Sequence, residues 1–394
     1  MSPNFKFTRA ACNIGYFVQA IVNNFLPVLF IVLQEQYSLS YEQLGRIILF
    51  NFVTQLITDA FTPKIVSVLG YRKTAVMCQG GAALGLSLLA ILPHIIPDTY
   101  LAIMLSVVVY AFSSGIMEVV LSPMCEALPS DNKSANMALL HSFYCWGQLV
   151  TVLVTTLLVK LLGYSGWTFI PLIWAVIPFL NMFSFLEAPI VEPEKEQRGK
   201  GIKELLKTKE FICCLIMMLC AGACEIALSE WSSLFAQRAL GVSKTVGDIA
   251  GPCAFALFMG TGRVVYASVS NKVSFKKAVM VMSALCFLCY VGAAVSGSAV
   301  ISLAACALCG FTVSFFWPGT YSYGARLFPL GGTLMFSMFA MCGDLGCSLG
   351  PWVIGAVADV SSLNIGILAA SVFAVIMFVT SLCLPSALEK NTDI

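Results

Sequence analysis

Long apolar runs alternate with short polar segments along the whole chain. A run of about 20 apolar residues has the length of one α-helix that crosses the hydrocarbon core of a bilayer. The pattern predicts twelve such helices, at 10–33, 42–63, 73–93, 99–123, 137–161, 166–187, 211–236, 247–270, 277–296, 298–323, 333–357 and 362–385. We therefore expect an all-α polytopic membrane protein with twelve transmembrane helices.

The composition also favours lipid as the surroundings of the chain. Of its 394 residues, 59% are hydrophobic and 11% are charged, whereas soluble domains are about 25% charged. The net charge of +2 gives no basic excess that would favour a nucleic acid. The expected partners are therefore the lipid bilayer and a small-molecule substrate, with no nucleic acid, and the chain is expected to be a monomer.

The basic residues predict how the chain crosses the membrane. An even number of helices puts both termini on the same side of the membrane. Most of the 22 lysines and arginines fall in loops on that side. Because cytoplasmic loops are enriched in lysine and arginine, both termini are expected in the cytoplasm. The polar stretch 188–210 is expected to be a cytoplasmic linker between an N-terminal six-helix bundle at 1–187 and a C-terminal six-helix bundle at 211–394.

An internal repeat supports this division. The segment KTAVM at 73–77 recurs as KKAVM at 276–280, each time at the start of the predicted third helix of its half. Repeated halves related by an axis along the membrane normal are one architecture of secondary transporters. We expect the two bundles to be pseudo-symmetric.

The loop after the second predicted helix carries a motif that resembles a family signature. The segment PKIVSVLGYRK keeps Gly70, Arg72 and Lys73 of the signature of the major facilitator superfamily, with Ser67 where that signature has an aspartate. The chain resembles that superfamily over essentially its whole length. The resemblance implies a plasma-membrane transporter, in a bacterial inner membrane, whose two bundles rock around a central site.

Within that superfamily, the chain looks closest to the fucose permease branch of sugar–proton symporters. The segment GIMEVVLSP keeps Gly115, Glu118 and Pro123 of that branch's helix-4 motif. AGACEIALSEW at 221–231 matches that branch's helix-7 element through Glu225, and two weaker matches are HSFYCWG at 141–147 and FFWPGTYS at 315–322. The branch also has an aspartate in helix 1, and here Asn23 and Asn24 occur without an acid. The resemblance implies sugar–cation symport, with a proton or sodium as coupling ion and no other cofactor.

Glu118 lies in the middle of a predicted span. A carboxylate at the bilayer centre costs about 2.5–3.5 kcal/mol, so it requires a partner, a proton or a water-filled cavity. Glu118 is either a structural acid bonded to neighbouring helices or a protonatable group that lines the cavity. We favour the second interpretation and predict proton coupling by Glu118, alone or with Glu225.

Further polar and aromatic residues within spans are candidates for substrate contact, because sugars need convergent donors and acceptors and a stacking face. The predicted substrate-binding residues are Asn23, Asn24, His141, Gln148, Glu225, Trp317 and Tyr321. The alternative for the polar members is an interhelical hydrogen bond or simple packing. Trp231, near the end of its span, is interpreted as an interfacial anchor.

Four charged residues are assigned to gating or to structural ion pairs: Asp59, Arg72, Arg263 and Asp344. The acid that pairs with Arg263 does not follow from spacing. The sixteen cysteines lie mostly within apolar runs and are expected to be packing residues, so no metal site is predicted. The sequence contains no HExxH, no P-loop lysine motif and no dinucleotide-binding fingerprint, which argues against an enzyme.

These observations predict a secondary transporter that takes up a monosaccharide or a similar small polar solute with a proton. A proton-driven exporter of an amphipathic compound is the alternative.

Overall fold

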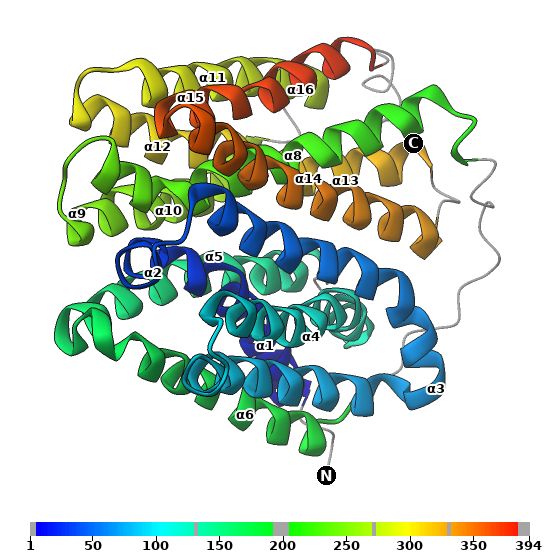
Figure 1. Ribbon diagram of the computed structural model, residues 1–394. Coiled ribbons are helices and arrows are strands. Elements are labelled where there is room, and N and C mark those ends of the chain that lie inside the picture. Colours follow the sequence, from blue (N-terminus) through cyan, green and yellow to red (C-terminus); the bar gives the residue numbers. More distant parts are fainter. Residues whose placement is uncertain (1–4, 130–132, 192–204, 270–272, 329–331, 385–394) are drawn as a thin grey trace. The chain divides into compact units, whose positions relative to one another are not determined.

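A computed structural model describes residues 5–129, 133–191, 205–269, 273–328 and 332–384 of the chain. It is helical throughout, and no strand occurs in these ranges. The chain divides into two compact units, Met1–Lys195 and Glu196–Ile394. Each unit is a bundle of helices that has its own core (Figure 1).

The helices of the first unit are α1 (Phe5–Val28), α2 (Phe30–Tyr37), α3 (Tyr41–Ile95), α4 (Thr99–Ala127), α5 (Lys133–Leu162), the short η1 (Tyr164–Phe169) and α6 (Ile170–Glu187). The second unit contains α8 (Lys209–Arg238), α9 (Lys244–Asp248), the π-helical turn η2 (Ile249–Cys253), α10 (Ala254–Val269), α11 (Phe275–Val295), α12 (Ala299–Val313), α13 (Phe316–Leu327), α14 (Gly332–Val360), α15 (Leu363–Ala370) and α16 (Val372–Leu382).

Helix α3 supplies two of the predicted spans. Its 55 residues would extend about 83 Å as one straight helix, far more than the roughly 30 Å hydrocarbon core. Gly70 interrupts it with φ 76° and ψ 164°, a conformation that residues with a Cβ rarely adopt. The sequence placed a loop over 64–72. Instead, the helix continues to Leu69 and resumes directly after Gly70.

The twelve-helix prediction is confirmed in this form. The described residues contain ten helices that are long and apolar enough to cross a membrane, and the bent pair α1 and α2 adds an eleventh. The interruption at Gly70 divides one of the ten into two spans.

Several spans that look continuous in the sequence are bent. The axes of α1 and α2 differ by 42° across Leu29, two residues after Pro27, which has no N–H to continue the helix ladder. A similar interruption at Ser314 and Phe315 separates α12 from α13. Hydropathy reports only that a segment is apolar, so it does not detect such breaks.

Glycines bring the backbones of neighbouring helices close together. A Cβ added at Gly350 of α14 would lie 2.6 Å from the carbonyl oxygen of Ala223 on α8. A Cβ at Gly85 of α3 would lie 2.6 Å from the backbone nitrogen of Tyr110 on α4. Small residues at helix contacts are the usual means of close packing inside membranes.

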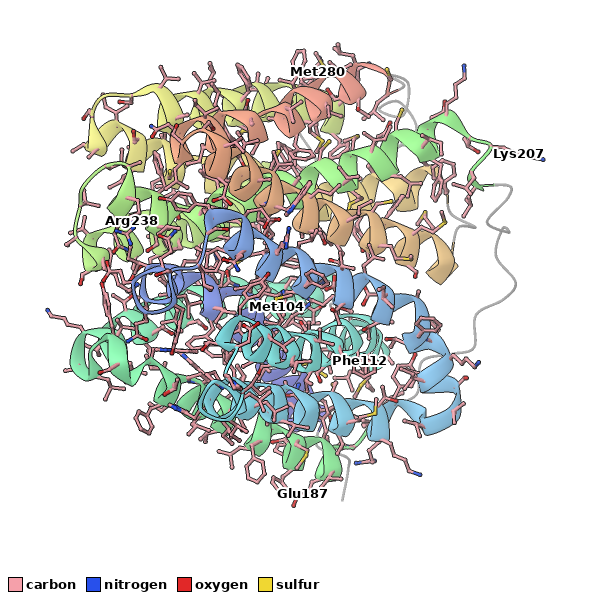
Figure 2. All side chains as sticks on the ribbon, in the orientation of Figure 1. Met104, Phe112, Glu187, Lys207, Arg238 and Met280 are labelled. Carbon is pink, nitrogen blue, oxygen red and sulfur yellow. The ribbon has the colours of Figure 1, made fainter. Side chains whose placement is uncertain are left out.

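Large apolar side chains cover the outer faces of the helices. Examples with more than half of their surface exposed are Phe61, Leu161 and Val300. Phe112 on α4, labelled in Figure 2, is also exposed. Apolar side chains on this scale are unfavourable in water and favourable against lipid tails. The outer faces therefore suit a bilayer, as the composition predicted.

Candidate functional site

In the first unit, a cluster of amides forms around Asn23 of α1. Its Oδ1 accepts hydrogen bonds from Asn51 Nδ2 at 3.2 Å and from Gln55 Nε2 at 3.0 Å. Asn51 and Gln55 are four residues apart on α3, so they lie on the same helix face. The Nδ2 groups of Asn23 and Asn24 both donate to the hydroxyl of Tyr144 on α5, at 3.5 and 3.3 Å. Three helices thus contribute to one polar cluster.

This amide cluster retains unused acceptors. Within the described ranges, no donor reaches Oδ1 of Asn51 or Oε1 of Gln55, and both atoms are buried. A buried acceptor without a donor costs about 1–3 kcal/mol. A hydroxyl-bearing solute could supply the donors that these two oxygens lack.

Glu118 of α4 belongs to an adjacent group. Its Oε2 accepts a 2.8 Å hydrogen bond from Gln19 Nε2 of α1. One helical turn further along α4, Ser122 shares a 2.5 Å hydrogen bond with the hydroxyl of Tyr16. The ring of Tyr16 packs edge-on against the ring of His141, with centroids 5.0 Å apart. Glu118 and His141 are therefore connected through the residues of α1.

The remaining first-unit candidates lie elsewhere. Gln148 is buried in α5, two turns beyond His141, and His141 itself is exposed. Asp59 is buried in α3 one turn beyond Gln55. A Cβ at Gly115 would lie 3.0 Å from Asp59 Oδ1, so Asp59 lies at a close contact between α4 and α3.

In the second unit, the structure identifies the acid that meets Arg263. Nη2 of Arg263 on α10 lies 3.6 Å from Oε1 of Glu225 on α8, and both side chains are largely buried. Nε of Arg263 donates to the carbonyl oxygen of Ser314 at 3.2 Å. That carbonyl has no helical partner four residues on, because Pro318 has no N–H to donate. The proline thus frees an acceptor that helps to hold the guanidinium.

Trp317 and Tyr321 stack one turn apart on α13, with ring centroids 6.3 Å apart and planes 14° apart. Gly343 of α14 leaves room for the indole, because a Cβ there would collide with the ring of Trp317. Asp344, the next residue along α14, is buried. Trp317 and Tyr321 therefore lie together on α13, and Trp317 packs against α14 at Gly343.

Comparison with known proteins agrees with this architecture. Residues 12–351 match the family described as Major Facilitator Superfamily. The chain belongs to this superfamily. Membership makes it a transporter rather than an enzyme, as the sequence predicted, and a multi-pass membrane protein.

The individual relatives of this superfamily member are distant. The membrane protein MosC of Rhizobium meliloti is 22% identical over 376 residues, which is 92% of this chain and 86% of MosC. Among solved structures, the nucleoside transporter NupG superposes with a TM-score of 0.75 at 14% identity, covering 95% of this chain and 99% of NupG. The fucose:proton symporter FucP of E. coli gives 0.67 at 15% identity, covering 95% and 98%. At these identities the structural likeness shows the fold alone.

A third solved structure is a bacterial homologue of the human lysosomal transporter Spinster. It superposes with a TM-score of 0.76 at 12% identity, over 97% of both chains. A nucleoside transporter and a fucose symporter therefore have the same fold. The fold by itself does not identify the solute that a transporter carries.

The signature loop of this superfamily member has a local structural function. Nη1 of Arg72 donates to the carbonyl oxygens of Phe185 and Leu186, at the end of α6, at 3.0 and 2.6 Å. In the second unit, Nζ of Lys276 donates to the last carbonyls of α16 and the residues just beyond it, those of Leu382 at 3.0 Å and Leu384 at 2.7 Å. Cations favour the carbonyl ends of helices. In each unit, a basic residue at the start of the repeated segment or directly before it thus binds carbonyl oxygens at the end of the unit's last helix.

The prediction for Trp231 was wrong. It is fully buried in α8, and its Nε1 donates to the carbonyl oxygen of Pro351 at 3.0 Å. An interfacial anchor would expose its ring at the surface. Distance from a helix end therefore did not identify the environment of this tryptophan.

Sequence analysis missed several polar residues at these sites. Gln19 lies three residues after Tyr16 and four before Asn23, so the three form one polar stripe on α1. This spacing was visible in the sequence. Glu230 and Asp248 are buried acids that were also missed.

Proposed function

We propose that this transporter couples proton entry to the uptake of a monosaccharide or a similarly small polar solute. We place it in a bacterial inner membrane with both termini in the cytoplasm. The observation that carries the substrate class is the amide cluster around Asn23, with its two buried acceptors at Asn51 and Gln55. Each hydroxyl of a sugar supplies one donor, so a solute with several hydroxyls can provide a donor for each of these two acceptors.

The surroundings of the two acids favour Glu118 as the coupling group of this site. The hydrogen bond to Glu118 comes from the neutral amide of Gln19, which can serve the carboxylate or the carbonyl oxygen of the neutral acid. Glu225 instead faces the cation of Arg263, which favours the ionised form. A coupling group must bind and release a proton in each transport cycle, and the neutral partner of Glu118 suits this better than the cation beside Glu225.

The fucose:proton symporter and the nucleoside transporter share this fold. The test should therefore include nucleosides beside monosaccharides. Purified protein in liposomes is given an inward proton gradient, and uptake of labelled L-fucose, D-galactose, D-glucose, uridine and adenosine is measured. The same panel is repeated with a sodium gradient at equal pH. We expect accumulation of a monosaccharide above its outside concentration with the proton gradient and not with sodium alone.

The outcomes separate the alternatives. Accumulation of a nucleoside but of no sugar would contradict the proposed substrate class. A sodium requirement would contradict proton coupling. Extrusion of a preloaded amphipathic dye by the opposite proton gradient, without sugar uptake, would support an exporter instead.

A further inference from the structure

Glu230 of α8 has an environment unlike those of the neighbouring acids. Only 3% of its surface is exposed, and no hydrogen bond from a described residue reaches Oε1 or Oε2. Glu225, on the same helix, has Arg263 at 3.6 Å. Asp248 accepts a 2.8 Å hydrogen bond from Lys244 Nζ and another from the hydroxyl of Ser233.

The energetic difference between the two forms of Glu230 is large. A buried carboxylate without a cation or donors costs several kcal/mol even after relaxation of its surroundings. A neutral carboxylic acid costs only the smaller penalty of an unpaired polar group. The environment of Glu230 therefore suits the protonated acid, whereas Glu225 and Asp248 have the partners of ionised acids.

We propose that Glu230 is a proton-binding site of the second unit, distinct from Glu118 in the first. In this conformation of the protein, the side chain of Glu230 is the neutral carboxylic acid. When the helices around it rearrange and admit water, its O–H bond breaks, the electron pair remains on the carboxylate oxygen and the proton passes to water. This inference rests on the proposed proton coupling and adds a second carrier to it.

The position of Glu230 offers a short route to water. It lies eight residues before Arg238, the last residue of α8, which corresponds to about 12 Å along the axis. Figure 2 labels the exposed Arg238 at this end of α8 and Lys207 near the opposite end. Ser233 is three residues beyond Glu230, so the two are neighbours on the helix surface. The hydroxyl of Ser233 donates a hydrogen bond to Asp248.

The charged groups on the surrounding elements do not provide a fixed partner. On α8, Glu225 lies five residues away, about 140° around the helix. Of the elements packed against α8, α9 carries Lys244 and Asp248, and α14 carries Asp344 and Asp359; α12, α15, α16 and η2 carry no Asp, Glu, Lys, Arg or His. The side chain of Arg326 on α13 lies outside the described residues. No described group among these bonds to Glu230.

The protonation state of Glu230 can be measured without knowing the substrate. Infrared spectra of the purified full-length protein at neutral pH contain the C=O stretching band of any neutral carboxylic acid. We compare the wild type with Glu230→Gln and, as the matched control on the same helix, Glu225→Gln. We expect Glu230→Gln to remove one such band and Glu225→Gln to remove a carboxylate band instead. The band of Glu230 should also shift in D₂O, because a carried proton must exchange with solvent.

Three results would overturn the proposal. The first is loss of a carboxylate band in Glu230→Gln. The second is an acid band that does not shift in D₂O, which would mark a permanently dry structural acid. The third is failure of Glu230→Gln to fold while Glu230→Asp folds, because an amide replaces a neutral acid but not a required anion. None of these depends on transport. A neutral, exchanging Glu230 in a protein without proton-driven uptake would therefore contradict the proposed function and leave the site intact.

Discussion

The ion pair between Glu225 and Arg263 permits the sharpest prediction of stability. The two charges are 3.6 Å apart, and their side chains are 11% and 23% exposed. At an effective dielectric constant of about 20, charges at this distance attract by roughly 4–5 kcal/mol. Glu225→Gln removes this attraction from a largely buried guanidinium, whose Nε keeps its hydrogen bond to the carbonyl oxygen of Ser314.

We expect Glu225→Gln to destabilise the protein by about 3–5 kcal/mol, as is typical when one member of a buried pair is removed. For a unit of this size, that corresponds to an apparent unfolding midpoint lower by roughly 6–20 °C. The double variant Glu225→Gln/Arg263→Gln should lose much less stability than the sum of the two single losses, because the attraction between the two charges is counted in each single loss but is removed only once in the double variant.

The assay is thermal unfolding of the purified protein in detergent, followed by the fraction that remains monodisperse after heating. Glu42→Gln is the matched control, because it makes the same chemical change in the exposed pair of Glu42 with Arg46. Exposed pairs of this kind contribute only about 0.3–0.5 kcal/mol, so its midpoint should barely change. A double variant whose loss equals the sum of the single losses, with a coupling energy below about 0.5 kcal/mol, would refute the reasoning.

The remaining predictions concern transport and packing. Glu118→Gln should abolish uptake driven by a pH gradient while sparing solute exchange, as measured in liposomes; normal gradient-driven uptake would count against Glu118 as a carrier. Asn23→Ala should weaken solute binding at least tenfold, by the loss of about 1.4 kcal/mol or more, and should destabilise the fold by about 1–3 kcal/mol or more, because the buried amides of Asn51 and Gln55 lose their acceptor; unchanged binding by calorimetry would make the cluster structural. Gly350→Val should lower the unfolding midpoint by roughly 2–12 °C, through about 1–3 kcal/mol of overpacking against Ala223, and a midpoint equal to that of the wild type would show that the backbones can separate without cost.

The sequence alone was sufficient for the architecture. Apolar length determines how many helices can cross a bilayer, and the repeated segments at 73–77 and 276–280 already indicated two related halves. The cost of polar groups in lipid also selected Glu118 and Glu225 as residues that need partners. These inferences depend on the free energy of transferring each segment from water into the bilayer, which follows from the composition of that segment alone.

Only the tertiary structure decides which acid pairs with Arg263. Whether Arg263 meets Asp59, Glu225 or Asp344 depends on helix rotation and tilt, which hydropathy does not contain. The freed carbonyl of Ser314 contributes to that choice, and it arises from a proline four residues away. The burial of Trp231 has the same origin, since rotation of α8 carries the ring into the core rather than toward lipid.

The contrast between Glu225 and Glu230 shows the division most clearly. The two acids lie five residues apart on one apolar helix, and the sequence gives no reason to treat them differently. The fold turns Glu225 toward a cation and surrounds Glu230 with groups that do not bond to it. The sequence thus places both acids within a segment that is apolar and long enough to cross the membrane. Three-dimensional packing decides their protonation states, because these depend on neighbours that are distant in sequence.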